Sequence, residues 1–346
     1  MYGLMRRRSM MTMVLPVPTE RPVYSLEDYT CDGTVNTFIN TGIRLFSKRY
    51  TSFRMELEYD DFDLINQTSQ ETISECKFIQ GAGTNLPGFT IRASSEKDDV
   101  NKMNINFPPG LENTFYENAS SARVSLYYDG VNNSVTVNGD TIAFGGDVFH
   151  LNPVTIGGRN YSSGKDRFVK CHIISLKIFA TPKKDGETIY KLENYQCDGT
   201  AATAINTGLY LFDASAYPNG WSIEFDFTIG DGNGGNASYL RCRNAASPYN
   251  GFCLRRNYGN ANQTQCQVFG GSALYNSTSG TRHSALIEKY GTKCSMGYDN
   301  EKELSSNLAS VVAPLVIGGE FDDTTQQWNT SRFSKIYIHS LIIKAL

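Results

Sequence analysis

The sequence lacks long apolar runs and has little charge of either sign. No stretch approaches the ~18 consecutive apolar residues that a membrane-spanning helix requires. Charged residues make up 19% of the 346 residues, and the formal net charge is -3. A nucleic-acid-binding domain usually presents a strongly basic face, so we expect no nucleic acid as a partner. Because no long apolar run is present, we expect no membrane as a partner either.

Signatures of metal binding and of catalysis are also missing. No Cys-x-x-Cys or Cys/His spacing suggests zinc, and neither a Gly-x-Ser-x-Gly elbow nor a phosphate loop occurs. The sequence has four histidines, of which His172 and His339 lie near the ends of the two halves. We interpret both as residues on strand surfaces rather than as catalysts.

The chain matches itself in a series of ordered blocks. Residues 24–34 read YSLEDYTCDGT and residues 190–200 read YKLENYQCDGT. Ile-Asn-Thr-Gly follows in each half, and Ile-Gly-Gly precedes the last segment of each. Blocks in the same order indicate a tandem duplication. We predict an arm at 1–21, a domain at 22–182, a linker at 183–189 and a second domain at 190–346.

Apolar and polar residues alternate with period two in both halves. Met55, Leu57 and Tyr59 alternate with acidic residues, and residues 223–227 do the same. This alternation predicts a sheet with one buried and one wet face. Asp-Gly at 129–130 and Asn-Gly at 138–139 are strong hairpin signals. Since no segment keeps a helical period, we predict an all-β chain of two tandem antiparallel β-sandwiches after a short extended arm.

The order of these motifs resembles the laminin-G-like, concanavalin A-like jelly roll. The opening motif of that family usually reads Phe-Asp-Gly, and here Cys31 and Cys197 stand in the phenylalanine position. The resemblance covers residues 22–346. It implies two-sheet sandwiches in which the opening and closing strands lie near each other, with a curved face that contacts carbohydrate or protein in many relatives. It does not fix a ligand, because one sandwich fold serves many functions.

The eight cysteines do not form a repeated framework. Only Cys31 and Cys197 occupy matching positions in the two halves, whereas disulfides of an ancestral domain would recur as pairs. Domains of this size also fold without disulfides. We therefore expect both cysteines to be buried and unbonded, which suggests synthesis inside a cell.

A glucanase of the same fold is the enzyme to consider. Its site needs three carboxylates in roughly the pattern Glu-x-Asp-x-x-Glu along one strand. Glu224 and Asp226 fit the first two places and the third is missing, whereas Glu56, Glu58 and Asp60 follow a different order. We interpret both sets as solvated outer faces and expect no catalytic residue.

Calcium is a minor hypothesis, and no other cofactor is expected. Residues 231–236 read DGNGGN, and hard cations prefer such oxygen ligands. Glycine and asparagine are also typical of an inserted turn, which is the interpretation that we favour.

Candidate glycan contacts cluster in the second half, between its predicted core strands, where loops carry function. Exposed aromatic rings stack on sugars, while amide and guanidinium groups bind hydroxyls. The candidates are Tyr249, Asn250, Arg255, Arg256, Tyr258, Tyr275 and Trp328. The alternative is that tyrosine is simply abundant, at 20 residues.

The arm combines basic and adaptable side chains without any period. Pro16 and Pro18 interrupt its apolar patch, so we interpret it as a retained arm rather than a signal peptide. Such a segment is expected to become ordered on a partner protein, although a dispensable tail is the alternative. The candidate docking residues are Arg6, Arg7, Arg8, Met10, Met11 and Met13.

A basic, Met-rich arm before laminin-G-like repeats resembles structural proteins of bacteriophage virions. The leading hypothesis is a non-enzymatic virion surface or appendage protein, made in the host cytoplasm. Its partners would be other virion proteins, in a homo-oligomer or a larger assembly, and cell-surface carbohydrate. A free lectin-like carbohydrate-binding protein is the second hypothesis, and a glycoside hydrolase is the third.

Overall fold

The computed structural model describes most of both halves of the chain. Among the described residues the elements are strands, apart from one 3-10 turn, η1 (Val35–Thr37). No helix in this part of the chain is long and apolar enough to cross a membrane. The candidate docking residues of the arm lie outside the described residues. The described residues are 21–61, 72–77, 88–93, 102–107, 111–117, 121–143, 148–161, 164–183, 186–244, 249–260, 262–299, 301, 303–309, 311–322 and 324–346.

The first sandwich pairs two antiparallel six-stranded sheets. One sheet has the order β1 (Tyr24–Asp32), β14 (Lys170–Pro182), β3 (Tyr50–Asp60), β8 (Ala122–Asp129), β9 (Ser134–Val137), β10 (Asp140–Ala143). The other has the order β2 (Ile39–Asn40), β11 (Thr155–Ile156), β4 (Thr72–Lys77), β5 (Gly88–Ala93), β6 (Lys102–Phe107), β7 (Leu111–Glu117). A small ribbon adds β12 (Arg159–Tyr161) and β13 (Gly164–Asp166).

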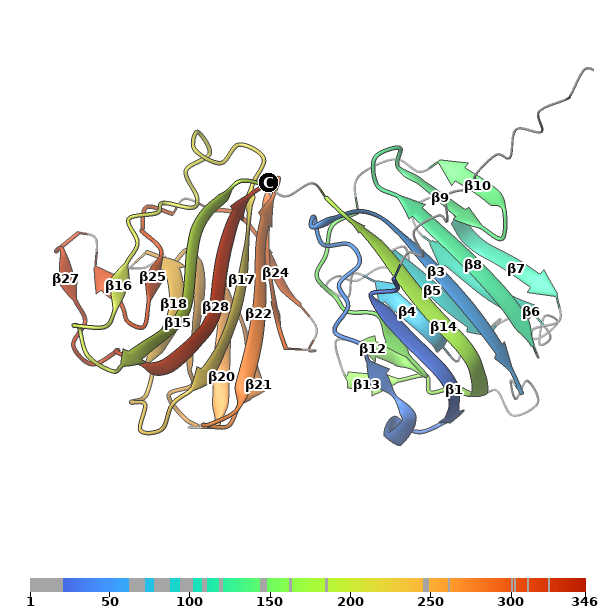
Figure 1. Cartoon of the computed structure of the whole chain (residues 1–346), viewed down its shortest axis with the longest axis horizontal. Helices are drawn as coiled ribbons and strands as arrows, with labels where there is room; N and C mark the ends of the chain where they lie inside the picture. Colours follow the sequence, from blue (N-terminus) through green and yellow to red (C-terminus); the bar gives the residue numbers. More distant parts are fainter. Residues whose placement is uncertain are drawn as a thin grey trace, which may run out of the picture.

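The second sandwich repeats this arrangement strand for strand (Figure 1). One sheet has the order β15 (Thr188–Asp198), β28 (Lys335–Ala345), β17 (Trp221–Ile229), β22 (Arg282–Tyr290), β23 (Lys293–Tyr298), β24 (Leu304–Asn307). The other has the order β16 (Ile205–Asn206), β25 (Val316–Ile317), β18 (Ser238–Arg243), β19 (Gly251–Arg256), β20 (Gln263–Val268), β21 (Gly271–Asn276). The ribbon here is β26 (Phe321–Asp322) with β27 (Gln327–Trp328).

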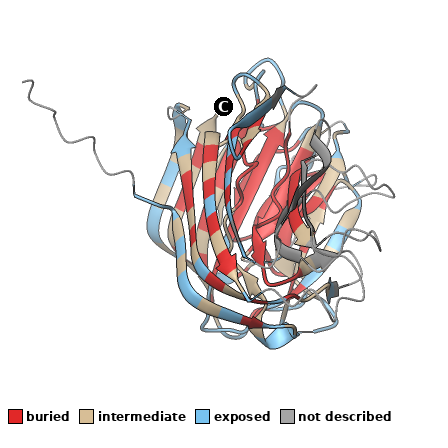
Figure 2. Cartoon of the chain, turned by 90° about the vertical axis from the view of Figure 1, so that its right-hand side faces the viewer, coloured by how far each residue is buried: buried red, intermediate tan, exposed pale blue. Residues whose placement is uncertain are grey.

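The predicted all-β fold of two tandem antiparallel sandwiches is confirmed. In each sandwich the opening strand pairs with the closing strand, β1 with β14 and β15 with β28, as the resemblance implied. The core of each lies between its two sheets. Figure 2 shows the buried residues, in red, gathered on strands of the sandwich. On β3 the inward residues are Phe53, Met55, Leu57 and Tyr59, each at most 1% exposed.

The repeated Cys-Asp-Gly-Thr motif builds the same turn in both sandwiches. One oxygen of Asp32 accepts from the Thr34 amide at 2.8 Å and from the Thr34 and Thr37 hydroxyls, each at 2.7 Å. Asp198 binds the matching threonines of the second sandwich in the same way. The hydroxyl hydrogen bonds lower the pKa of both aspartates. The glycine that follows each aspartate has a positive φ, which favours glycine over other residues.

The expectation that only Cys31 and Cys197 match is wrong, because Cys76 lies opposite Phe89 just as Cys242 lies opposite Phe252. The expected burial and free state of Cys31 and Cys197 agree with the structure. The seven whose side chains are described are buried and free, and they include Cys31 and Cys197. Burial raises the pKa of the Cys197 thiol to about 12, so this group is a neutral, apolar part of the core.

Candidate functional site

A pocket lies on the outer face of the sheet formed by β18, β19 and β20, away from the core of the second sandwich. Its volume is about 290 Å³. Outward positions of β18 and β19 supply its floor, and the segments around residues 236, 249, 320 and 332 supply its walls. The lining residues are Asn236, Arg241, Arg243, Tyr249, Arg255, Glu320 and Arg332. We call it the arginine pocket.

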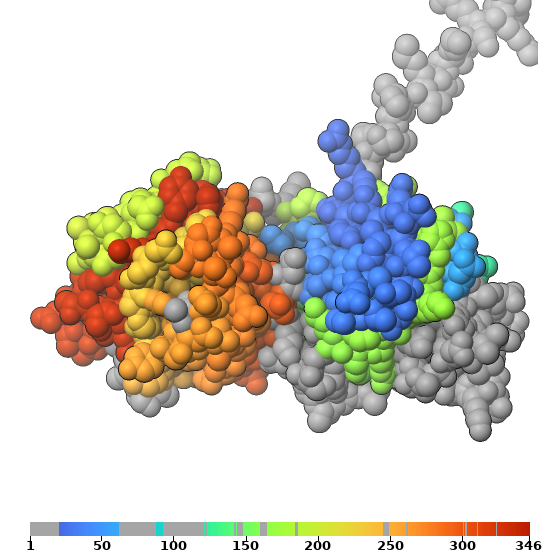
Figure 3. All heavy atoms as spheres, turned by 90° about the horizontal axis from the view of Figure 1, so that it is seen from below, coloured from blue at the N-terminus to red at the C-terminus, as the bar shows by residue number. Residues whose placement is uncertain are grey.

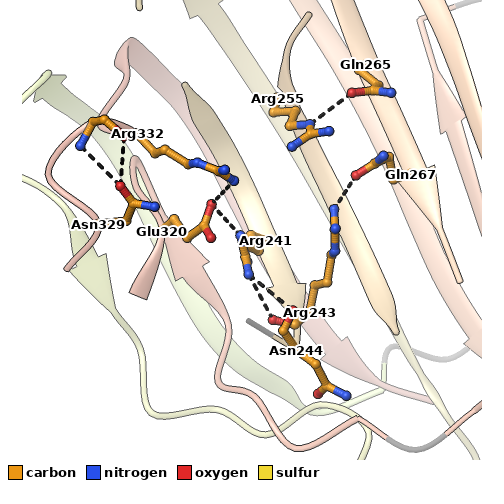
Figure 4. A network of polar contacts seen from close by, with 10 residues as sticks. Arg241, Arg243, Asn244, Arg255, Gln265, Gln267, Glu320, Asn329 and Arg332 are labelled. Carbon is orange, nitrogen blue, oxygen red and sulfur yellow. Dashed lines mark hydrogen bonds and ion pairs between the residues drawn. The ribbon is translucent and has the colours of Figure 1, made fainter. Parts of the chain in front are cut away.

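Glu320 fixes one side of the arginine pocket (Figure 4). Its Oε2 lies 2.5 Å from Nη1 of Arg241 and 2.6 Å from Nη1 of Arg332. Arg241 and Glu320 are 3% and 7% exposed, so this ion pair is shielded from solvent. Arg241 also donates to the backbone carbonyls of Arg243 and Asn244. A buried ion pair is stable only when such additional hydrogen bonds satisfy its remaining donors. Together, the ion pair and the two carbonyls hold Arg241 in one orientation.

Arg243 is also buried but faces a different kind of partner. Its side chain donates to the neutral Oε1 of Gln267, and its guanidinium carbon lies 4.4 Å from the centre of the Tyr249 ring. Arg243 is 8% exposed, and its Nε has no hydrogen-bond partner among the described residues. Burial lowers the pKa of Arg243, and the charges of Arg241 and Arg255 lower it further, while Cys253 and Glu320 oppose this change.

The pocket has a clear excess of positive charge. Arg255 donates through Nε to the neutral Oε1 of Gln265 at 2.9 Å, so it too has a side-chain acceptor without charge. Four arginines therefore surround one carboxylate among the lining residues. Guanidinium groups bind carboxylates and phosphates through paired hydrogen bonds. The arrangement can bind an anionic group.

Two of the candidate glycan contacts from the sequence lie in this pocket. Arg255 forms part of its floor and Tyr249, 52% exposed, forms part of its rim. Arg256 follows Arg255 on the same strand and so points to the opposite face of the sheet, toward Tyr239. Asn250 is half-buried, and its carbonyl accepts from the Asn244 amide.

The other three candidates lie apart from the floor. Tyr258 is 79% exposed, and its ring lies over Gly235, next to Asn236 of the pocket rim. Tyr275 is 8% exposed and stacks on Tyr298 within the core. Trp328 packs on Phe321 and Phe333.

Sequence reasoning missed Arg241, Arg243, Glu320 and Arg332. Arg241 and Arg243 alternate with Leu240 and Cys242 along β18, and that signal could have placed them on an outer face. Their proximity to Arg255 depends on the register, in which Arg241 lies opposite Cys253. No sequence pattern fixes that register.

The carboxylates considered for a glucanase site each contact a basic side chain. Glu56 lies 3.2 Å from Arg54, and Glu58 lies 2.8 Å from Arg123. His172 binds Asp60 at 2.7 Å. In the second sandwich, Glu224 pairs with Arg49 at 3.4 Å and Asp226 pairs with Arg282. Each of these carboxylates thus lies within ion-pair or hydrogen-bond distance of a basic side chain.

The segment proposed for calcium uses its buried amide for another purpose. Asn233 donates to the carbonyls of Gly230 and Lys335 and accepts from the Lys335 amide. It thereby joins this loop to the start of β28. In the part of the chain that the structure describes, no three His, Cys, Asp or Glu side chains are grouped so as to hold a metal ion.

No protein-family model and no curated protein matches this sequence. Among solved structures, the chain is similar to mouse laminin alpha1 domains LG4-5, with 14% identity, 93% of each chain covered and a TM-score of 0.31. It is also similar to the CBM40 of the Ruminococcus gnavus IT-sialidase bound to alpha2,3 sialyllactose, with 10% identity, 46% of this chain and 94% of the other covered, and a TM-score of 0.34. A third is the Caenorhabditis elegans galectin LEC-6, with 9% identity, 44% and 95% covered, and a TM-score of 0.28.

Proposed function

We propose that the chain is a non-enzymatic binding protein whose second sandwich holds an acidic glycan in the arginine pocket. The observation that carries the proposal is Arg243, a buried cation whose side-chain acceptor is the neutral Gln267. Burying a charge without an opposite charge is costly. A carboxylate on the ligand would offset that cost.

The dimensions and lining of the pocket support a sugar unit as the ligand. A volume of about 290 Å³ is near the lower end of small-molecule sites, which start at about 300 Å³. The Tyr249 ring offers an apolar surface for one face of a sugar ring. Asn236 offers an amide group for hydroxyls, and the arginines offer paired donors for a carboxylate.

Calorimetric titration with matched oligosaccharides tests this proposal. One member of each pair ends in a carboxylated sugar and the other ends in a neutral sugar. We expect Arg243→Met and Arg255→Met each to weaken binding of the acidic member at least about tenfold, since a hydrogen bond to a charged group contributes about 1.5–3 kcal/mol.

Arg256→Met is the matched control, because it removes the same charge one residue along β19 from the opposite face. It should bind as the unmodified protein does. Equal affinity for acidic and neutral sugars, or normal binding by Arg243→Met, would contradict the proposal.

We further propose that this binding protein acts on the surface of a virion, where the arm would attach the two sandwiches. The support is the sequence of residues 1–21, with its arginines, methionines and prolines. Deleting residues 1–18 should leave the melting temperature unchanged and abolish incorporation into particles. Normal incorporation of the truncated chain would place the attachment surface on the sandwiches instead.

A further inference from the structure

The two sandwiches meet through a largely buried interface. Figure 3 shows them as adjoining bodies, with blue atoms of the first next to orange atoms of the second. Two segments of the first sandwich, residues 44–49 and 148–152, contact the second near β22, β23 and the start of β24. Phe149, Leu151 and Leu286 form a small apolar cluster there, with Tyr290 packed against it.

Glu288 of β22 accepts hydrogen bonds from the first sandwich on both carboxylate oxygens. Its Oε1 accepts from the Ser47 hydroxyl at 2.7 Å, and its Oε2 accepts from the Lys48 amide at 3.1 Å. Glu288 is 0% exposed. Arg49 and Glu224 are the other charged groups that act on it.

Glu303 lies just before β24 and makes a reciprocal contact. Its Oε2 accepts from the Leu151 amide at 2.5 Å, and its Oε1 lies 3.5 Å from the side-chain nitrogen of Asn152. Its own amide donates to the side-chain oxygen of Asn152 at 3.0 Å. Glu303 is 3% exposed, so the docked first sandwich shields it from water.

Arg44 completes the contact from the first sandwich. It donates to the carbonyls of Leu151, Asp299 and Glu301. Its guanidinium occupies the space that a Cβ at Gly297 of β23 would fill, so a larger residue there would displace the Arg44 side chain. The cation of one sandwich is therefore held mainly by backbone oxygens of the other.

Burial controls the ionisation of the two glutamates. It raises the pKa of Glu303 to about 7, against the opposing effects of the Leu151 amide, Arg44, Ser295 and Lys293. It also raises the pKa of Glu288, against its hydrogen bonds and Arg49. The charges of Glu303 and Glu301 act on Tyr275, and those of Lys293 and Arg44 act on His150. Burial lowers the pKa of His150 to about 3 and raises that of Tyr275, so both stay neutral near pH 7.

We propose that docking of the two sandwiches is proton-linked, so that they hold together more tightly in mild acid and loosen as the pH rises through neutrality. Opening the interface would return Glu303 to water, where its pKa falls toward the ordinary value of 4.5. The docked state therefore binds a proton that the open state releases. By linkage, raising the pH favours the open state.

Hydrogen exchange of the interface amides measures this equilibrium in the full chain. The Leu151 and Lys48 amides donate to the two glutamates, so they exchange when the interface opens. After correction for the intrinsic exchange rate, their protection should fall about tenfold between pH 6 and pH 8. Amides of the central strands, such as those of Leu126 and Leu254, should keep their protection.

Glu303→Gln isolates the responsible group, because its side chain stays neutral at every pH. In this variant the fall in protection of the Leu151 amide between pH 6 and pH 8 should be much smaller, with Glu288 as the remaining buried carboxylate of the interface. Glu193→Gln, at an exposed position of β15, is the matched control and should keep the pH dependence of the unmodified protein. Protection that is flat or rises with pH in the unmodified chain, or an unchanged slope in Glu303→Gln, would overturn the proposal.

Discussion

The two sandwiches share a strand order and a turn motif but differ on one outer face. In the second, Arg241 of β18 pairs with Val316 of β25. At the equivalent place in the first, Glu75 of β4 pairs with Thr155 of β11. The same ladder position thus carries opposite charges in the two copies.

The residue after Ile-Gly-Gly changes sign in the opposite sense. It is Glu320 in the second sandwich, bound to Arg241, and Arg159 in the first, bound to Asp166 at 2.7 Å. The two copies therefore reverse the charges at a matched pair of positions. The comparison separates features that the two copies share from features that differ, and Arg241 and Glu320 belong to the second group.

Charge reversal at Arg241 is the strongest way to break this comparison. Arg241→Glu would bury a second carboxylate against Glu320, and we expect the second sandwich to lose about 3–5 kcal/mol of unfolding free energy. Binding of acidic sugars should be lost as well. Both tryptophans of the chain, Trp221 and Trp328, lie in this sandwich, so tryptophan fluorescence during urea unfolding follows it selectively.

The double variant Arg241→Glu/Glu320→Arg is the companion experiment. It copies the charge order of the first sandwich and should recover much of the lost stability without recovering sugar binding. If the double variant is no more stable than the single one, the two pairs of positions are not equivalent.

Substitutions at Cys31 and Cys197 test a core position that the two sandwiches share. We expect Cys197→Asp to cost about 3 kcal/mol, because it places an ionisable group in an apolar core. Cys31→Asp should cost less, since Cys31 lies opposite Cys171 across the ladder, whereas Cys197 lies opposite Ile336. The Cys171 thiol already hydrogen-bonds to Cys31 and lowers its pKa.

Thermal unfolding followed by circular dichroism would compare the two variants. The corresponding alanine variants serve as controls for the loss of volume alone. If Cys31→Asp lost more stability than Cys197→Asp, the residue opposite each cysteine in the paired strand would not determine the cost of the substitution.

The fold could be predicted from the sequence because its determinants are local or repeated. Alternation along residues 53–59 fixes which side chains of β3 face the core, and the repeated Asp32 and Asp198 turns mark where each copy begins. The site could be predicted only in part. Arg255 and Tyr249 were found because they belong to a cluster in sequence. Arg241 was missed because the β18–β19 register brings it there.

The interface between the sandwiches was beyond any sequence pattern. Glu288 lies in a stretch that reads ALIEKY, and Glu303 lies in one that reads DNEKEL. Both look like ordinary surface acids. Their burial results from the docking of segments about 150 to 240 residues earlier in the chain, which is a property of tertiary structure alone.

His172 offers the smallest test of the comparison, since it gives the first sandwich a pH response at a position where the second has Tyr337. The strand pairing makes these equivalent, because Thr30 lies opposite His172 and Gln196 lies opposite Tyr337. His172 bonds through Nε2 to Asp28 at 2.9 Å and through Nδ1 to Asp60 at 2.7 Å.

These two hydrogen bonds raise the pKa of His172 above its ordinary value of 6.5, and the hydrogen bond to Asp28 has the larger effect. The folded first sandwich therefore favours the protonated imidazole. The resulting stabilisation is fully present below the unfolded pKa and is lost as the pH rises through the folded pKa. Since the site is exposed and screened by solvent, the effect on stability should be small.

Titration of the His172 ring protons by NMR should give a pKa above 6.5 that falls in Asp28→Asn and falls further when Asp60→Asn is added. Asp140→Asn, at the far edge of the same sheet, should leave it unchanged. A pKa at or below 6.5 in the unmodified protein would show that the two aspartates do not act on this ring in solution.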